Sequence, residues 1–338
     1  MARLITIIGG GLAGLSLGIG LRKAGVPVDL HEAGEYPRHR VCGEFISGVS
    51  NETLDSLGIG EPLRETQTLS TTCWYRQGES VHNYNLPSPA KGISRYQLDR
   101  ALSEIFVTAG GNLHCRSRQE FEPREGVVRA TGRLPKKGKW VGLKCHLKNF
   151  PLEADLEMHM GRNGYAGLCR VENGEVNLCG LFRTPVSKSG GPQGIWENTL
   201  KAGGFENLLR RVQAASIRED SFCAVAGFHL GWQVEQPGAL TVGDSSVMIP
   251  PFTGNGMSMA FQSAECALPF LVDYAEGRIS WPEALRSTQE ALRNRFTRRM
   301  ITARIAHPFL THPAGQALLC GAVRTGMLPI EILYRLLR

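Results

Sequence analysis

The N-terminal part of the chain alternates between short apolar runs and glycine-rich turns, which is the pattern of a βαβ unit. Residues 4–8 form a β-rich apolar run that predicts a buried parallel strand. Apolar positions recur at helical spacing along residues 12–24, and Gly25 is the expected stop of that helix. Residues 26–32 form a second β-rich run. We therefore expect a strand, a helix and a parallel strand, in that order.

In the middle of the chain, apolar residues recur at every second position instead. Apolar and polar positions alternate in residues 66–90 and 139–185, most clearly along residues 140–147, and this predicts antiparallel strands. The Asn-Gly pair within residues 171–176 predicts the turn of a hairpin.

Weaker patterns predict the remaining elements. We expect helices over 96–108 and 256–274, strands over 126–130 and 240–242, a loop over 187–192, and a mainly helical chain from 281 onward. The apolar run after Met1 is interrupted by six glycines within residues 4–20, so we interpret it as a strand, a turn and a helix rather than a signal peptide. No uninterrupted run of ~18 apolar residues predicts a membrane-spanning helix.

Composition narrows the class of protein. The 338 residues suggest about two domains, and the 42% apolar fraction excludes a disordered chain, a collagen and a coiled coil. The net charge of +7 comes mostly from positions after 286, and no nucleic-acid-binding module accompanies it, so we expect no nucleic-acid partner. Nine scattered cysteines without a CxxC pair argue against a disulfide framework or a metal site. They are typical of a reducing cytoplasm.

A G-x-G-x-x-G motif lies between the first expected strand and helix. Its first glycine permits the turn, the second lets a pyrophosphate approach the backbone, and the third lets the helix pack on the strand. The N–H groups at the start of the helix can bind phosphate oxygens. An acid 21 residues after Gly11 can accept ribose hydroxyls. The expected cofactor-binding residues of this segment are Gly9, Gly11, Leu12, Ala13, Gly14 and Glu32.

A second glycine-rich turn lies far down the chain. The expected strand at 240–242 ends in Gly243-Asp244, and a Pro-Pro-Phe-Thr-Gly-Asn-Gly-Met turn opens the next helix. FAD in its extended form needs an acid for the ribityl hydroxyls, and a helix N-terminus beside the flavin O2, where the dipole stabilises the reduced ring. Asp244 fits the first role. Gly254, Asn255, Gly256 and Met257 fit the second. The two turns together favour FAD over NAD.

With these motifs the chain resembles the FAD-dependent oxidoreductase superfamily that includes p-hydroxybenzoate hydroxylase-type monooxygenases and geranylgeranyl reductases. The matching segments, in the order of the family, are 9–14, 32, 37–44, 95–99, 130–133, 243–244 and 251–260. The resemblance implies that Arg95 lies near the FAD pyrophosphate or ribityl chain, and that Cys42 and Gly43 lie beside the isoalloxazine. Arg38 and Arg40 add positive charge near the pyrophosphate.

The expected fold class is α/β (α+β mixed). A Rossmann-type FAD-binding domain with a parallel sheet is joined to a substrate domain with an antiparallel sheet, and helices follow at the C-terminus. We expect the FAD-binding domain at 1–65, 92–135 and 222–278, the substrate domain at 66–91 and 136–221, and the C-terminal helical segment at 279–338.

Three motifs depart from the patterns of the superfamily. Residues 164–168 keep only the Tyr of the reductases' Tyr-x-Trp-x-Phe-Pro motif, and the Trp-x-Trp-x-Ile-Pro motif of flavin-dependent halogenases is absent, which argues against halogenation. Thr131 stands where aromatic hydroxylases have the Asp of an Asp-Gly motif that helps bind NADPH. The electron donor is therefore transient NAD(P)H, a separate flavin reductase, or FAD supplied already reduced.

The candidate catalytic residues each have two interpretations. Lys144 and His146 alternate on an expected strand, where they face either the flavin, as an acid or charge stabiliser, or solvent. Cys42 either packs beside the cofactor or takes part in the chemistry. Tyr165 and His159 are weaker candidates.

Basic and apolar positions alternate in the C-terminal segment. Leu285, Leu292, Phe296 and Met300 recur at near-helical spacing, with arginines at six of the intervening positions up to 304. Such a helix either caps the substrate domain or lies weakly on a membrane surface. The apolar stretch 327–337 favours an apolar substrate.

The leading hypothesis is an FAD-dependent monooxygenase (hydroxylase) that acts on an apolar or phenolic small molecule in secondary metabolism. The alternatives are an FAD-dependent reductase of isoprenoid or polyene double bonds, a flavin-binding protein without turnover, and an NAD dehydrogenase. In this superfamily the flavin carries out most of the chemistry, so the absence of a catalytic triad does not argue against an enzyme.

Overall fold

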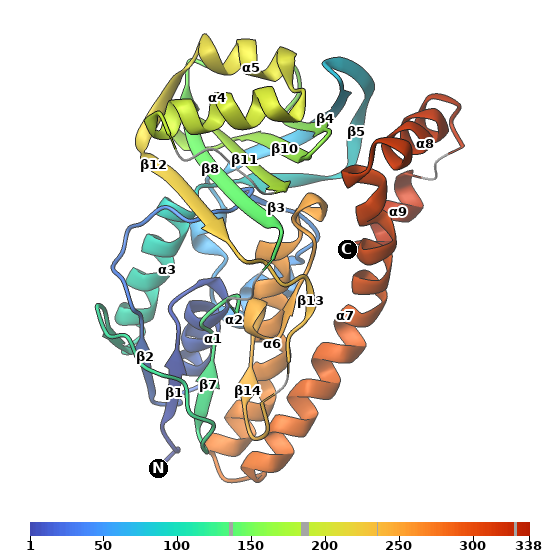
Figure 1. Ribbon diagram of the computed structural model, residues 1–338. Coiled ribbons are helices and arrows are strands. Elements are labelled where there is room, and N and C mark those ends of the chain that lie inside the picture. Colours follow the sequence, from blue (N-terminus) through green and yellow to red (C-terminus); the bar gives the residue numbers. More distant parts are fainter. Residues whose placement is uncertain (135–137, 184–188, 235, 328–329) are drawn as a thin grey trace.

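The computed structural model describes residues 1–134, 138–183, 189–234, 236–327 and 330–338 (Figure 1). A five-stranded sheet has the order β14-β7-β1-β2-β6, and all its pairs are parallel. Its strands are β1 (Ile5–Ile8), β2 (Val28–His31), β6 (Asn112–His114), β7 (Val127–Arg129) and β14 (Leu240–Thr241).

Helices pack on the apolar side chains that the central strands present, including Val28 and Leu30 of β2. In β1, Ile5 and Ile7 are completely buried. One hydrophobic core joins this sheet to α1 (Leu12–Lys23), α2 (Asn51–Leu57), α3 (Arg95–Thr108) and α6 (Gly256–Ala275). The predicted strand–helix–strand unit and the return to this sheet at 240–242 are both confirmed.

A larger sheet has the order β12-β8-β11-β10-β9-β4-β5-β3. Its pairs are antiparallel except for β4 with β9. The strands are β3 (Phe45–Ile46), β4 (Gln67–Arg76), β5 (Glu79–Gly92), β8 (Trp140–Lys148), β9 (Leu156–Gly161), β10 (Gly164–Arg170), β11 (Val176–Arg183) and β12 (Ser216–Ala226). Asn173 and Gly174 both have positive φ in the turn between β10 and β11, so the predicted hairpin is confirmed.

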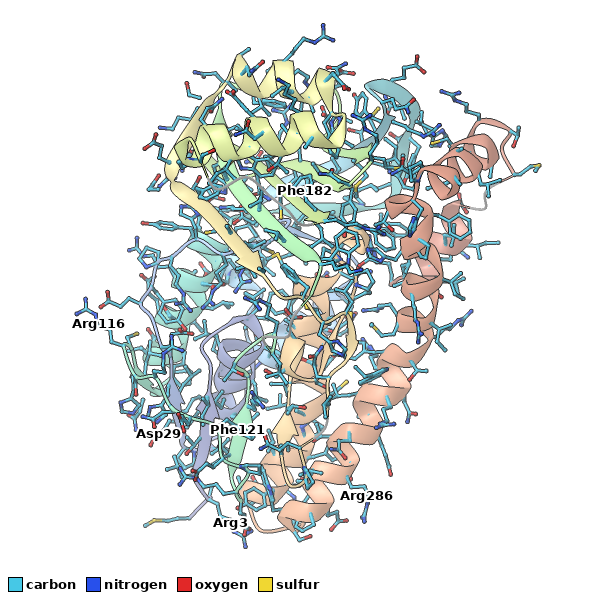
Figure 2. The ribbon with its side chains drawn as sticks, in the orientation of Figure 1. Arg3, Asp29, Arg116, Phe121, Phe182 and Arg286 are labelled. Carbon is cyan, nitrogen blue, oxygen red and sulfur yellow. The ribbon has the colours of Figure 1, made fainter. Side chains whose placement is uncertain are left out.

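Two helices, α4 (Gly191–Gly203) and α5 (Glu206–Gln213), cover the outer face of this sheet (Figure 1). The ring of Phe182 lies 5.8 Å from that of Trp196 in the core between them (Figure 2). The sequence patterns predict neither helix. Gly191 and Pro192 are expected in a loop, whereas they form the first turn of α4, where proline is favoured. Positions 187–188 of that predicted loop lie outside the described residues.

Three helices close the molecule on one side: α7 (Trp281–Thr311), α8 (Pro313–Arg324) and α9 (Ile330–Leu336) (Figure 1). Leu292, Phe296 and Met300 of α7 pack into a core with Met259 of α6. The predicted apolar face of this helix therefore packs on α6, and α7 also contacts β9 and β10 of the large sheet. None of the described helices is long and apolar enough to cross a membrane.

The remaining short elements connect these layers. They are the two-stranded sheet of β13 (Gly231–Trp232) and β15 (Val247–Met248), and the 3₁₀ turns Glu61–Leu63, Glu172–Gly174, Gly243–Ser245 and Pro251–Thr253.

Candidate functional site

A cavity of about 1700 Å³ runs between the two sheets and out to the C-terminal helices. Ligand pockets for drug-sized molecules usually hold about 300–1,000 Å³. The cavity therefore has room for a large cofactor together with a second molecule. Its walls include both glycine-rich turns that the sequence singled out, although they are more than 200 positions apart in the chain.

The first turn has the close approaches that a phosphate-binding loop requires. A Cβ on Gly14 would lie 2.0 Å from the carbonyl oxygen of Gly9, so only glycine lets α1 pack this close to β1. A Cβ on Gly11 would meet nothing within 4 Å, and Gly11 lines the cavity with Leu12 and Ala13. The helix N-terminus has no side-chain cap. Its N–H groups can therefore bind an anion.

Glu32 lies at the end of β2 beside this turn and is buried. Its carboxylate accepts hydrogen bonds from the backbone N–H groups of Gly10 (2.9 Å) and Gly34 (2.8 Å). It also forms ion pairs with Arg38 (2.6 Å) and Arg40 (3.4 Å). Burial opposes its ionisation, but the Gly34 N–H, Arg40 and Arg38 hold its pKa below the usual range. Glu32 is therefore an ionised acceptor. Ribose hydroxyls could take the place of an arginine there.

Arg95 begins α3 and lines the cavity with Cys42 and Gly43. It makes two hydrogen bonds to Asp99 (2.6 and 2.8 Å), and Arg40 pairs with the same carboxylate at 3.0 Å. The sequence analysis assigned Arg40 to the pyrophosphate. Here Arg40 joins Glu32 to Asp99, so it holds two acids in place at the edge of the cavity.

Asp244, at the second turn, lines the cavity and accepts no hydrogen bond from the described residues. Burial raises its pKa to about 6, and Arg95 and Arg133 offset this only in part. A half-buried carboxylate without donors is destabilised, and ligand hydroxyls would satisfy it. Asp244 therefore fits the ribityl-binding role predicted for it.

The turn after Asp244 presents a second helix N-terminus to the same cavity. α6 starts after Asn255 without a side-chain cap, and a Cβ on Gly256 would meet nothing within 4 Å. Gly254, Gly256 and Met257 line the cavity, whereas Asn255 is fully buried beneath them. Asn255 instead donates to the carbonyl of Leu337, which fixes α9 against the turn. Tyr165 accepts a hydrogen bond from the backbone N–H of Phe252 at 3.1 Å, so it positions the turn from the large sheet.

Lys144 and His146 lie on the face of β8 that points toward the parallel-sheet domain, and both are fully buried. Lys144 Nζ lies 3.2 Å from Glu44 Oε1, and His146 Nε2 lies 2.6 Å from Glu44 Oε2. His146 Nδ1 faces Glu175 at 2.9 Å. Neither Lys144 nor His146 lines the cavity, and neither faces solvent. The sequence predicts that these two side chains face either the flavin or solvent, and the structure places them in neither position.

Glu44 is the centre of this buried network, and the sequence analysis gave it no role of its own. It has a φ of 57°, which is rare for a residue with a side chain. Burial opposes its ionisation, but His146 and Lys144 lower its pKa. It also accepts the backbone N–H of Arg95 at 3.0 Å. Glu44 thus links the start of α3 to β8.

The same network fixes the loop that carries Cys42. Asn177 donates to the carbonyl of Cys42 (3.0 Å), and the Cys169 thiol donates to that of Gly43 (3.1 Å). Burial raises the pKa of the Cys42 thiol, which keeps it protonated. A nucleophilic thiolate is thereby disfavoured, and a packing role beside the cofactor fits better.

His39, Glu44 and His146 are spaced as metal ligands could be, with their ligand atoms within 4.8 Å of one another. The ammonium of Lys144 already lies among them, 2.9 Å from His39 Nδ1. A second cation at this place would be repelled. His159, another candidate from the sequence, lies 2.9 Å from Glu157 in a separate buried cluster with Arg211.

The far end of the cavity is apolar. Its lining comes from β4, β5, β9 and β10 on one side and from α7, α8 and α9 on the other. Residues that the sequence patterns do not mark form much of this wall, including Trp74, Tyr84, Leu86, Met158 and Phe309. They are ordinary strand and helix residues in sequence, so only the fold reveals that they share a chamber.

Comparison with known proteins agrees with this geometry. Residues 3–146 match the family model described as "FAD binding domain". No curated protein matches the chain. Among solved structures, p-nitrophenol 4-monooxygenase PnpA from Pseudomonas putida has a TM-score of 0.77 at 12% identity, covering 99% of this chain and 97% of that one.

Two further structures have the same fold. Klebsiella pneumoniae HpxO, complexed with FAD and uric acid, has a TM-score of 0.75 at 14% identity over 99% of this chain and 96% of its own. PqsL of P. aeruginosa, in complex with 2-aminobenzoylacetate, has a TM-score of 0.68 at 16% identity over 91% and 96%.

The uncapped helix N-termini, the unpartnered Asp244 and the open positions at Gly11 and Gly256 fit an extended dinucleotide that carries hydroxyls between its two ends. FAD has that shape and that polarity. The chain therefore carries an FAD-binding domain and shares its fold with p-nitrophenol 4-monooxygenase PnpA and with HpxO.

Proposed function

We propose that the protein is an FAD-dependent monooxygenase that hydroxylates an apolar or phenolic small molecule. The observation that carries the proposal is the continuity of one cavity, from the FAD cradle at Gly11 and Asp244 to an apolar chamber under the large sheet. A substrate in the chamber would lie next to the flavin end of the cofactor. The solved structures with this fold include a nitrophenol monooxygenase and a complex with uric acid.

The chain's own residues bind and orient the two molecules. The N-terminus of α1 would hold the pyrophosphate, Glu32 the ribose and Asp244 the ribityl hydroxyls. The N-terminus of α6 would face the pyrimidine edge of the flavin, where its dipole stabilises negative charge. Bound FAD supplies the chemistry of electron transfer and oxygen activation. The apolar chamber excludes water from the reacting atoms.

Lys144 and His146 act in this proposal as positioning residues rather than catalytic ones. They hold Glu44, which in turn fixes the start of α3 through the backbone N–H of Arg95. Cys42 packs beside the flavin as a neutral thiol.

Thr131 indicates which electron donor the protein uses. Its hydroxyl lies 3.4 Å from that of Ser245 and 3.2 Å from Arg129 Nε, so it offers no carboxylate to a nicotinamide nucleotide. We expect slow reduction by NAD(P)H alone and faster reduction by a separate flavin reductase.

Purified protein tests the proposal in two steps. A yellow protein with absorbance near ~450 nm carries the flavin, and titration with NADPH and NADH then measures its reduction. Reduced protein is next mixed with candidate phenols under isotopically labelled oxygen. Label in the product supports the monooxygenase, and reoxidation without product in every case contradicts it.

The second candidate is a reductase of isoprenoid or polyene double bonds. Cys42 lines the cavity within segment 37–44, one of the segments by which the chain resembles a superfamily that includes geranylgeranyl reductases, and this supports the reductase. Reduction of such a double bond without oxygen identifies the reductase. A yellow protein with neither activity would be a flavin-binding protein without turnover, and a colourless one that binds NADH would be a dehydrogenase.

A further inference from the structure

The apolar end of the cavity opens at the surface between α7, α8 and α9. Four large apolar side chains line this opening and are nevertheless exposed: Ile305 by 65%, Phe309 by 39%, Leu318 by 68% and Met327 by 75%. We call these four residues the apolar rim. Such residues are costly to leave in water when they are contiguous, and they mark interaction surfaces.

The surroundings of the apolar rim are basic. Residues 291–330 contain six arginines and no Asp or Glu. Arg298 and Arg304 lie three residues before and after Ile301, which is itself exposed and one turn from Ile305. Both arginines therefore flank the exposed stripe of α7. Neither forms an ion pair with a described residue, so their charge is available to an anionic partner.

We propose that the apolar rim, with Arg298 and Arg304, docks the protein on an anionic lipid bilayer, from which an apolar molecule enters the cavity. A bilayer offers both chemistries that the surface needs, since acyl chains accept the apolar rim and anionic headgroups accept the arginines. The rim residues come from α7, from α8 and from Met327 after α8, rather than from a groove along one helix, so they suit a broad surface better than a single bound peptide. The entry of substrate rests on the proposed function, whereas the docking does not.

Sedimentation of the FAD-loaded protein with vesicles tests the docking. One set of vesicles is phosphatidylcholine alone, and the other contains equal parts of phosphatidylcholine and phosphatidylglycerol. We expect binding to the mixed vesicles at least about tenfold tighter than to phosphatidylcholine, and weaker binding as salt is added.

Two double variants separate the contributions. Ile305→Ser with Leu318→Ser should weaken binding to mixed vesicles by about tenfold or more, because the lost apolar area no longer enters the bilayer. Arg298→Glu with Arg304→Glu should abolish the preference for phosphatidylglycerol. All four positions are exposed, so the fold and the FAD absorbance should stay unchanged.

Matched controls carry the same changes elsewhere on the surface. Val107→Ser with Val234→Ser alters two exposed apolar residues, and Arg64→Glu with Arg210→Glu alters two exposed arginines. Both controls should bind vesicles as the unaltered protein does.

Equal binding to both kinds of vesicle, or unchanged binding of the two test variants, overturns the proposal. Capture of an acidic protein by the apolar rim without any vesicle binding also overturns it. Binding is measured without turnover, so its failure leaves the monooxygenase untouched. A protein that binds vesicles but hydroxylates nothing would refute the proposed function alone.

Discussion

At the scale of single residues, Asp244 is an acid on the cavity wall that accepts no hydrogen bond from the described residues. Its pKa is raised to about 6 from a usual 3.8, so the folded, FAD-free protein holds that proton more tightly than the unfolded chain does. The contribution of Asp244 to stability is therefore present below about pH 4 and is lost as the pH rises to about 6. FAD hydroxyls need the ionised form as an acceptor.

We predict that Asp244→Asn makes the FAD-free protein more stable at neutral pH and weakens FAD binding by about tenfold or more. In the unaltered protein, FAD affinity should rise as the pH passes about 6. Fluorescence titration with FAD across pH, and urea unfolding of the FAD-free forms, measure both effects. An affinity that is flat with pH would contradict the assigned role.

The buried pair of Lys144 and Glu44 gives a second prediction at this scale. Both side chains are fully buried, so Lys144→Met leaves the buried carboxylate of Glu44 without its ammonium partner. We expect a loss of about 3–5 kcal/mol in the free energy of unfolding, measured with urea. The exposed pair of Arg100 and Glu104 is the control, and Arg100→Ala should cost less than about 1 kcal/mol. Equal losses at the two sites would contradict the network described above.

Between neighbouring elements, two glycines of the first glycine-rich turn have different roles. Gly14 allows the helix to pack on the strand, and Gly11 leaves room for the cofactor. Gly14→Ala forces a Cβ against the carbonyl of Gly9, so we expect destabilised packing of α1 on β1. Gly11→Ala meets no protein atom and has an ordinary φ of −84°, so we expect an intact fold that no longer binds FAD. Circular dichroism and flavin absorbance distinguish the two outcomes. A Gly11→Ala protein that stays yellow would contradict the placement of the pyrophosphate.

The elements near these turns could be predicted from sequence because their signals are local. The strand, turn and helix at 4–24 and the Asn-Gly hairpin follow from spacing and from residues that favour positive φ. α4 and α5 were missed because the glycines and proline before them resemble a loop, and because α5 is short.

The candidate site could likewise be predicted from the sequence only where a local motif marks its residues. Residues fixed by a motif, such as Gly11, Glu32 and Asp244, lie on the cavity as expected. Lys144 and His146 were identified as unusual polar residues on a strand, but their partner Glu44 lies about 100 positions away, and no local pattern reveals that pairing. The apolar chamber could not be predicted either, because its lining residues are far apart in the chain.

At the scale of the whole molecule, FAD should stabilise both sheets together. The cavity touches residues of the parallel sheet, the large sheet and the C-terminal helices. A ligand that binds only the folded state adds about 2.7 kcal/mol at a free concentration of about 100 times Kd. We predict one cooperative thermal transition that moves upward with added FAD. The Gly11→Ala protein should show no shift, and a transition that splits in two would contradict a shared cofactor.

The parallel sheet is built from segments that lie far apart in the chain. The stretch that matches the FAD-binding family model ends at 146, yet β14 pairs with β7, and α6 packs in the same core as α1. A fragment cut at that boundary would lose an edge strand and expose apolar surface of α1. No fragment that ends at residue 146 contains this whole core, and a fusion or domain exchange must also keep β14 and α6.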